Sequence, residues 1–265
     1  MNKKKEANMP GEIKNVLVTG SSGLIGSMLI RSLGDKYTFS GLDISKPSGA
    51  PDIPTTVTDA ASLEDILPAF DGVDAVIHLA ANPAVDTPWE DVLHNNISLT
   101  HNVYEACRRQ GVRRVVFASS NHAVGLFEND EPYRRIVKGD YSGIDPDNIP
   151  QVDHKVPIRP DSDYGISKAF GEATGRYYSE EFGVEAACLR IGTVNRHNDP
   201  TQSVRHFATW CSHRDLAQLV DRCLSVDLKF DIFYGVSANK WRFWDISHAA
   251  NVLGYQPADN AETYR

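Results

Sequence analysis

Short runs of apolar residues alternate along the chain with longer segments whose apolar residues recur at helical spacing. The apolar runs lie at residues 15–19, 37–42, 75–79, 114–118, 185–190 and 230–235. The helical patterns cover residues 23–33, 63–70, 94–110, 164–182, 213–224 and 246–253. Apolar runs without strict alternation are typical of strands that are covered on both faces. The order of elements therefore predicts an α/β protein with a Rossmann-type, doubly wound parallel sheet.

The segment from 128 to 163 departs from this pattern because prolines and glycines interrupt it. They are Pro132, Gly139, Gly143, Pro146, Pro150, Pro157 and Pro160. We expect a long ordered loop across the top of the sheet, and such loops usually serve a site. A chain of 265 residues suits one large α/β domain. We expect residues 1–10 to be a flexible tail and 11–265 to be a single domain. Its substrate-binding elements are expected at about 126–163 and in a small C-terminal part at 192–265.

Composition narrows the possible partners. The formal net charge is −8, and an acidic surface repels phosphate backbones, so we expect no nucleic-acid partner. No stretch approaches the roughly 18 apolar residues of a membrane span, and we find no signal peptide, so we expect a cytoplasmic protein. The four cysteines include no C-x-x-C pair and are expected to be free thiols. The histidines show no metal-ligand spacing, so we expect no metal.

A glycine-rich turn lies where the first predicted strand meets the first predicted helix. Gly20 allows a tight turn, Gly23 allows a pyrophosphate to approach the backbone closely, and Gly26 allows the helix to pack closely on the strand. The helix N-terminus offers unpaired N–H groups to phosphates. Asp43 ends the second predicted strand. A carboxylate there accepts hydrogen bonds from the ribose hydroxyls and repels a 2′-phosphate, so this residue favours NAD over NADP. A turn or capping role is the alternative for Asp43.

A second motif carries candidate chemistry. Tyr164 and Lys168 are four residues apart and share one face of a predicted helix. A lysine ammonium close to a phenol, like a cationic nicotinamide ring, lowers the tyrosine pKa, so we expect Tyr164 to act as a general base near neutral pH. Ser120 follows the strand at 114–118, at the sheet edge that lines the ligand crevice. It is a candidate to hold the reacting oxygen, or else an ordinary loop serine.

Together these motifs resemble the extended short-chain dehydrogenase/reductase superfamily of the NAD-dependent epimerase/dehydratase type. The resemblance covers residues 13–257 and includes His78-Leu79-Ala80-Ala81 and Leu189-Arg190. It implies a catalytic trio of Ser120, Tyr164 and Lys168, with Asn96 ordering water near the lysine. It also implies cofactor contacts at Gly20, Ser22, Gly23, Leu24, Ile25, Gly26, Asp43, Val57, Leu79, Ala80, Ala81, Tyr164 and Lys168. Thr56 precedes Val57 where the family often has an aspartate.

A narrower likeness concerns the sugar. The segments 117–122, 164–172, 190–192 and 208–210 look like those of uronate dehydrogenases and archaeal-type NAD-dependent glucose-6-phosphate dehydrogenases. Both oxidise C1 of a cyclic sugar to a lactone. The likeness implies sugar contacts at Ser120, Asn121, His122 and Thr193, and an anion anchor at Arg205. It therefore implies a sugar that is anionic, a hexuronate or a sugar phosphate. Pro83 departs from the uronate enzymes, which have a serine there.

Two other functions stay open at this point. A sugar epimerase or dehydratase would keep NAD bound and regenerate it, whereas a non-catalytic NAD-binding regulator would not need the Tyr164–Lys168 pair. Many relatives pair as dimers, so a homodimer is an expectation from the family alone.

Overall fold

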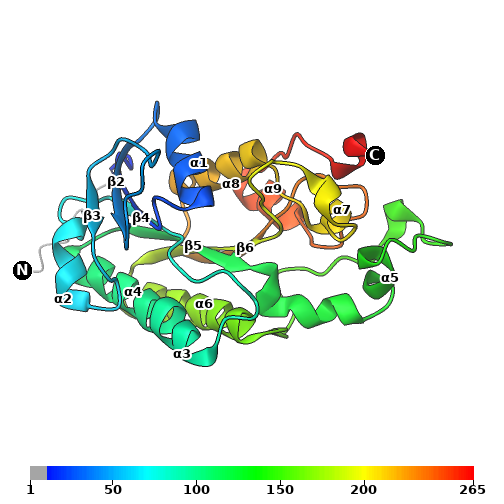
Figure 1. Ribbon diagram of the computed structural model, residues 1–265, viewed down its shortest axis with the longest axis horizontal. Helices are drawn as coiled ribbons and strands as arrows, with labels where there is room; N and C mark the ends of the chain where they lie inside the picture. Colours follow the sequence, from blue (N-terminus) through cyan, green and yellow to red (C-terminus); the bar gives the residue numbers. More distant parts are fainter. Residues whose placement is uncertain (1–10) are drawn as a thin grey trace, which may run out of the picture.

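The computed structural model describes residues 11–265, so the predicted tail at 1–10 lies outside the described residues. These residues form a seven-stranded parallel sheet of order β3-β2-β1-β4-β5-β6-β7 (Figure 1). The strands are β1 (Asn15–Thr19), β2 (Thr38–Asp43), β3 (Thr55–Val57), β4 (Ala75–His78), β5 (Arg114–Ser120), β6 (Glu185–Ile191) and β7 (Phe230–Gly235). The predicted doubly wound fold is confirmed. Strand β3 was not predicted, because its three residues are not buried and form no apolar run.

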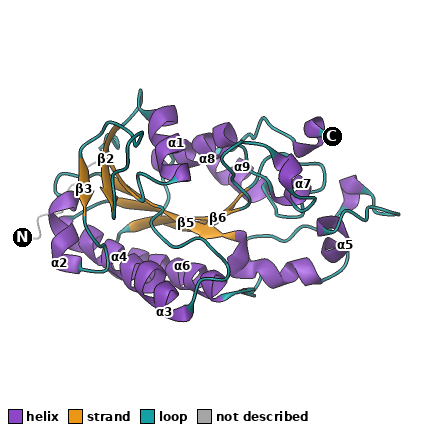
Figure 2. Ribbon diagram, in the orientation of Figure 1, coloured by secondary structure: helices purple, strands orange, loops and turns teal. Residues whose placement is uncertain are grey.

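Helices cover both faces of the sheet (Figures 1 and 2). The longer ones are α1 (Leu24–Leu33), α4 (Leu99–Gln110), α6 (Asp163–Phe182), α8 (His213–Ser225) and α9 (Ser247–Leu253). Shorter ones are α2 (Leu63–Ile66), α3 (Trp89–Val92), α5 (Tyr133–Val137) and α7 (His206–Thr209). The helix predicted at 94–110 begins earlier, as α3, and continues through a π-helical turn over Leu93–Ser98 into α4. None of the helices described here is long and apolar enough to cross a membrane.

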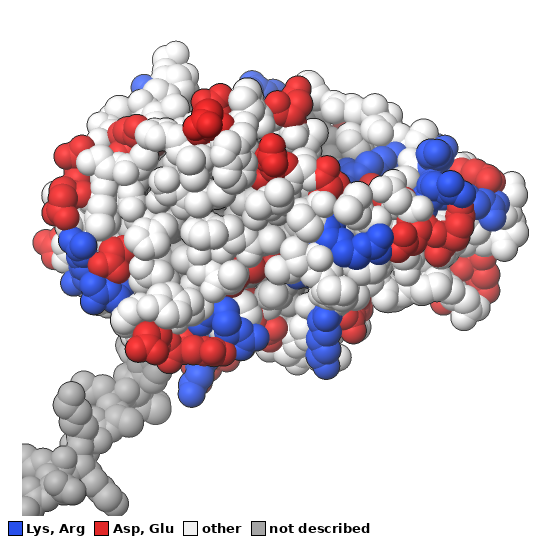
Figure 3. Space-filling model, turned by 90° about the horizontal axis from the view of Figure 1, so that it is seen from below, with Lys and Arg blue, Asp and Glu red and all other residues white. Residues whose placement is uncertain are grey.

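The sheet separates two hydrophobic cores. One joins α1 and α8 to one face, and the other joins α4 and the end of α6 to the opposite face. The central strands β1 and β4 are buried over most of their length, as expected for parallel strands covered on both sides. On the face seen in Figure 3, acidic and basic side chains are interspersed rather than gathered in separate fields.

The segment predicted as a loop at 128–163 is more ordered than expected. It contains α5 and a short 3₁₀ turn at Pro146–Asn148, and it follows a 3₁₀ helix at Asn121–Asn129. A third hydrophobic cluster joins it to the C-terminal part, and Val152 pairs with Trp244 in a parallel bridge. The two segments in which we expected substrate-binding elements therefore pack on each other, beside the ends of β5 and β6 (Figure 1).

One buried ion pair ties α6 to the sheet. Arg190 of β6 donates from Nε and Nη2 to the two carboxylate oxygens of Glu172 of α6, each over 2.9 Å. The Ser119 hydroxyl donates to Glu172 Oε1 over 2.6 Å, and Arg190 Nη1 donates to the Tyr234 hydroxyl over 3.1 Å. Both charged residues are almost fully buried, so neither can exchange its partner for water.

We predict that Glu172→Gln lowers the free energy of unfolding by about 3–5 kcal/mol, because it leaves Arg190 as a buried cation without a counter-charge. Glu180→Gln is the matched control, since it removes the exposed partner of Arg176 on the same helix. That control should cost at most about 1 kcal/mol. Urea unfolding measures both variants, and equal losses would contradict the prediction.

Candidate active site

A cavity of about 820 Å³ opens at the carboxyl ends of the strands. It runs from the β1–α1 turn, past the ends of β4 and β5, to the segment after β6. Most of the residues predicted from the sequence line it: Gly20, Ser22, Gly23, Leu24, Ile25, Gly26, Asp43, Leu79, Ala80, Ala81, Ser120, Asn121, His122, Tyr164, Lys168, Thr193 and Arg205. The fold thus brings one chemical site together from segments far apart in the sequence.

The glycine-rich turn is shaped by close backbone contacts. Gly20 has a positive φ of 71°, and a Cβ there would lie 3.0 Å from the backbone nitrogen of Ala80. A Cβ at Gly26 would lie 2.3 Å from the carbonyl oxygen of Gly20. No side chain caps the N-terminus of α1, so its first-turn N–H groups face the cavity without helical partners. This arrangement suits a phosphate group.

Asp43 stands at the end of β2, beside that turn. Its Oδ2 accepts a hydrogen bond from the backbone N–H of Ser22 over 2.9 Å, and its Oδ1 accepts one from Ser45 over 3.3 Å. The carboxylate therefore braces the turn and also lines the cavity, so both roles considered from the sequence are compatible. Lys46, a basic residue close by in the sequence, donates instead to the carbonyl of Ile53 over 2.8 Å.

Tyr164 and Lys168 lie on the first turns of α6, next to Ser120. The lysine Nζ is 5.3 Å from the centre of the Tyr164 ring and 5.2 Å from that of Phe117. Burial raises the pKa of Tyr164 to about 12, although hydrogen bonding to Ser120 opposes the rise, and the charge of Asp161 adds to it. Burial also lowers the pKa of Lys168 to about 8.

These shifts correct one expectation from the sequence. Lys168, with a cationic nicotinamide ring acting in the same direction, was expected to lower the pKa of Tyr164, but in the protein alone desolvation by burial is the largest influence and raises it. Tyr164 is therefore a neutral phenol in this state. Further positive charge in the cavity would be needed to favour its ionised form.

Two predicted residues lie outside the cavity wall. Asn96 is buried. Its Oδ1 accepts a hydrogen bond from the backbone N–H of Asn82 over 2.8 Å, and its Nδ2 donates one to the Ser167 hydroxyl over 3.1 Å. It therefore joins the loop after β4 to α6, one residue before Lys168, and its proposed role in ordering water stays a prediction. Val57 is half exposed and does not line the cavity, whereas its neighbour Thr58 does.

The far end of the cavity is polar. His122 Nδ1 lies 2.7 Å from Asp161 Oδ2, and the His122 ring packs edge-on against Tyr164 at 5.8 Å between centroids. Thr193 exchanges a hydroxyl hydrogen bond of 2.9 Å with Thr209. Asp161 could not be found from local spacing, because it pairs with a residue 39 positions away.

Arg205 lies at the same end of the cavity, and its charge is compensated by an ion pair. Its Nε and Nη2 donate to the two carboxylate oxygens of Glu128, both over 2.6 Å. Sequence reasoning missed Glu128, which stands 77 positions away from its partner, so no local spacing relates the two.

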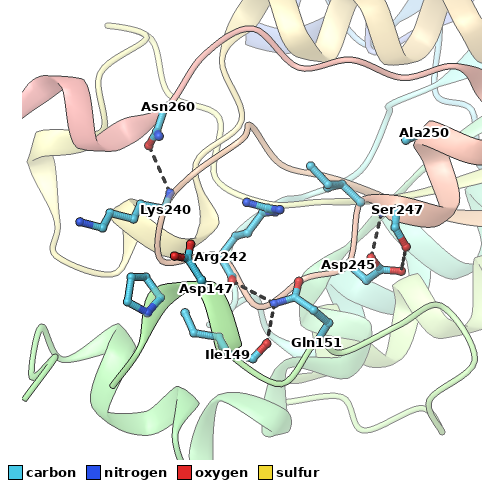
Figure 4. A pocket seen from close by; sticks show the side chains of 11 residues that line it. Asp147, Ile149, Gln151, Lys240, Arg242, Asp245, Ser247, Ala250 and Asn260 are labelled. Carbon is cyan, nitrogen blue, oxygen red and sulfur yellow. Dashed lines mark hydrogen bonds between the residues drawn. The ribbon is translucent and has the colours of Figure 1, made fainter. Parts of the chain in front are cut away.

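A second cavity, of about 670 Å³, lies between the segment around Pro146–Asn148 and the C-terminal part (Figure 4). Gln151 spans it by donating to the carbonyls of Ile149 and Arg242. Its lining includes none of the residues predicted for the site. The residues predicted for the chemistry therefore belong to the first cavity.

One cluster of possible metal ligands appears among residues 11–265, although the sequence spacing suggested none. The candidate ligand atoms of His154, Asp231 and His248 lie within 4.8 Å of one another. The two histidine rings stack, however, with centroids 3.6 Å apart and planes 12° from parallel. Stacked rings cannot both direct a nitrogen lone pair at one ion. His248 Nε2 instead lies 2.9 Å from both carboxylate oxygens of Asp231.

Comparison with known proteins agrees with this geometry. The chain is 36% identical over 256 residues to an NAD-dependent glucose-6-phosphate dehydrogenase of Haloferax volcanii, covering 94% of this chain and 95% of the relative. It is 33% identical over 265 residues to an L-arabinose 1-dehydrogenase (NAD(P)(+)) of the same organism, covering 94% and 98%.

A solved structure is similar over nearly the whole fold. It is a variant of uronate dehydrogenase from Agrobacterium tumefaciens complexed with NAD, 33% identical, with a TM-score of 0.80 over 95% of this chain and 87% of that one. The family model described as the NAD dependent epimerase/dehydratase family matches residues 16–218. The match covers the glycine-rich turn, Tyr164 and Lys168, and extends to within the C-terminal part. The chain therefore belongs to the NAD-dependent epimerase/dehydratase family.

Proposed function

We propose that the protein is an NAD-dependent sugar dehydrogenase that oxidises C1 of a cyclic sugar to the lactone. The observation that carries the proposal is a single cavity that joins the glycine-rich turn to Ser120, Tyr164 and Lys168. The names of the relatives support it, because the first two are dehydrogenases of sugars or sugar phosphates.

The residues present fit NAD. The open N–H groups of Leu24, Ile25 and Gly26 would hold the pyrophosphate, where a Cβ at Gly26 would disturb the turn. The Asp43 carboxylate would accept hydrogen bonds from the ribose hydroxyls. When bound, NAD accepts the hydride that leaves C1 of the sugar.

Side chains of the protein carry out the proton transfer and hold the reacting oxygen. Tyr164, in its phenolate form, takes the proton from the anomeric hydroxyl. The Lys168 ammonium, held 5.3 Å from the centre of the phenol ring, stabilises that negative charge. Ser120 donates a hydrogen bond to the reacting oxygen and holds it beside the base.

An epimerase or dehydratase is the alternative reading, since the family contains both classes. Three relatives that are 33% to 36% identical carry dehydrogenase names, so this alternative is not favoured. A non-catalytic regulator is also not favoured, because the buried Tyr164–Lys168 pair lines the cavity. The expectations of a homodimer and of a cytoplasmic location stay predictions.

The proposal is tested by net formation of NADH from NAD. The sugars to offer are glucuronate, galacturonate, glucose 6-phosphate, glucose, galactose and arabinose. We expect sustained turnover with at least one of them, followed by the absorbance of NADH. An epimerase would convert a sugar without net NADH, and that result would reject the dehydrogenase proposal.

We predict that Tyr164→Phe lowers kcat by about 10²- to 10⁴-fold, the usual contribution of a general base. Affinity for NADH should stay nearly the same, because the substitution removes one hydroxyl only. Tyr177→Phe, at an exposed position on the same helix, is the matched control. Turnover of the Tyr164 variant at the wild-type rate would show that another group takes the proton.

We predict that Asp43→Asn brings the dissociation constants of NADPH and NADH closer together by about tenfold. The physical reason is that the carboxylate charge no longer repels a 2′-phosphate. Fluorescence titration measures both constants, with Asp52→Asn, an exposed position outside the cavity, as the control. An unchanged ratio would mean that Asp43 only braces the turn.

A further inference from the structure

Arg205 lines the cavity, and the charge of its guanidinium group is compensated by Glu128, which is not itself a lining residue. Glu128 and Arg205 form a bidentate ion pair in which both N···O distances are 2.6 Å, and bidentate pairs are the strong form of this interaction. The exposed fractions of the two side chains are 26% for Arg205 and 14% for Glu128, so solvent screens the pair only in part. The pair contributes no net charge to the end of the cavity where the sugar would bind.

Glu128 is held in this place by more than Arg205. It lies in the 3₁₀ helix Asn121–Asn129, which begins directly after Ser120. The Asn121 side-chain amide donates to Glu128 Oε1 over 3.3 Å. The carboxylate is thus connected to the segment that carries the expected sugar contacts, and its position does not depend on Arg205 alone.

The other cations of the cavity do not replace the lost charge. Among the residues that line the described cavity, the lysines and arginines are Lys168 and Arg205 alone. Lys168 belongs to the catalytic end, packed against Tyr164. His122 is engaged by Asp161 at 2.7 Å. A carboxylate or phosphate on the sugar would therefore meet no uncompensated cation near Thr193.

The consequence concerns the charge of the substrate. An anionic group that approaches Arg205 is repelled by Glu128, or must displace it and leave a partly buried carboxylate without its partner. A neutral hydroxyl has no such cost, and Arg205 Nη1 still points toward Thr193 Oγ1 at 3.4 Å as a donor on that side.

We propose that Glu128 is a specificity-determining residue that cancels the charge of Arg205, so that the protein takes a neutral aldose in preference to a hexuronate or a sugar phosphate. The inference rests on the proposed function, because it assigns the substrate class of the same site. It replaces the anionic sugar expected from the sequence, which depended on Arg205 as a free cation.

The test compares kcat/KM for anionic sugars (glucuronate and glucose 6-phosphate) with kcat/KM for neutral ones (arabinose and galactose). We expect the wild-type protein to favour a neutral sugar. Glu128→Gln keeps the shape of the side chain and removes its charge. It should raise the anionic-to-neutral ratio on the order of 10- to 100-fold, mainly through KM for the anionic sugar.

Three further variants make the result specific. Glu131→Gln removes an exposed partner of Arg134 in the next turn of chain, outside the cavity, and should leave the ratio unaltered. Glu128→Asp retains the charge and should retain the preference for a neutral sugar. Adding Arg205→Met to Glu128→Gln should abolish the gain for anionic sugars, because the freed guanidinium is its source.

Failure of the inference and failure of the proposed function give different results. A wild-type preference for an anionic sugar that Glu128→Gln weakens would overturn the inference and leave the dehydrogenase intact, since Glu128 would then orient Arg205 toward the anion. If no sugar is oxidised, the proposed function fails. Calorimetric binding of the same sugars to the NADH-bound protein and its variants would then decide the charge preference by dissociation constants.

Discussion

Tyr164 and Lys168 keep their positions because the helix that carries them is tied to the sheet by one buried ion pair. Glu172 lies about two turns beyond Tyr164 and one turn beyond Lys168 on α6, and Arg190 reaches it from β6. Such a pair is directional and cannot slide, since each charge would lose its partner in a place that water does not reach. Hydrophobic packing alone would hold α6 against the sheet, but it would fix the positions of Tyr164 and Lys168 less closely.

The cavity end of the same helix carries two groups, Tyr164 and Lys168, whose charged forms are destabilised by burial. Burial lowers the pKa of Lys168 to about 8 and raises that of Tyr164 to about 12, which means that both charged forms are disfavoured there. Further positive charge in the cavity would favour the phenolate form of Tyr164. The well-satisfied pair at Glu172 and the less satisfied pair at the cavity thus have different roles on one helix.

The parts that sequence could predict are those encoded locally. The glycine-rich turn, Tyr164 with Lys168, and the apolar strands each rest on residues a few positions apart, so spacing alone reveals them. Strand β3 and the short helices of the segment at 128–163 escaped because packing against neighbours, rather than their own pattern, makes them form. The orientation of Tyr164 and Lys168 could be predicted, but their pKa shifts could not, since those depend on tertiary burial.

The same limit applies to the charge at the proposed sugar site, which depends on tertiary contacts. Arg205 is a cation in the sequence, and a cation beside a sugar cavity favours an anionic ligand as long as it is free. Whether it is free depends on Glu128, which the chain brings to it across 77 positions through the packing of the 3₁₀ helix Asn121–Asn129 near α7. The field that a ligand meets is the sum of both groups. The proposed type of reaction therefore rests on short motifs at the edge of the sheet, whereas the proposed substrate class rests on how two distant segments meet there.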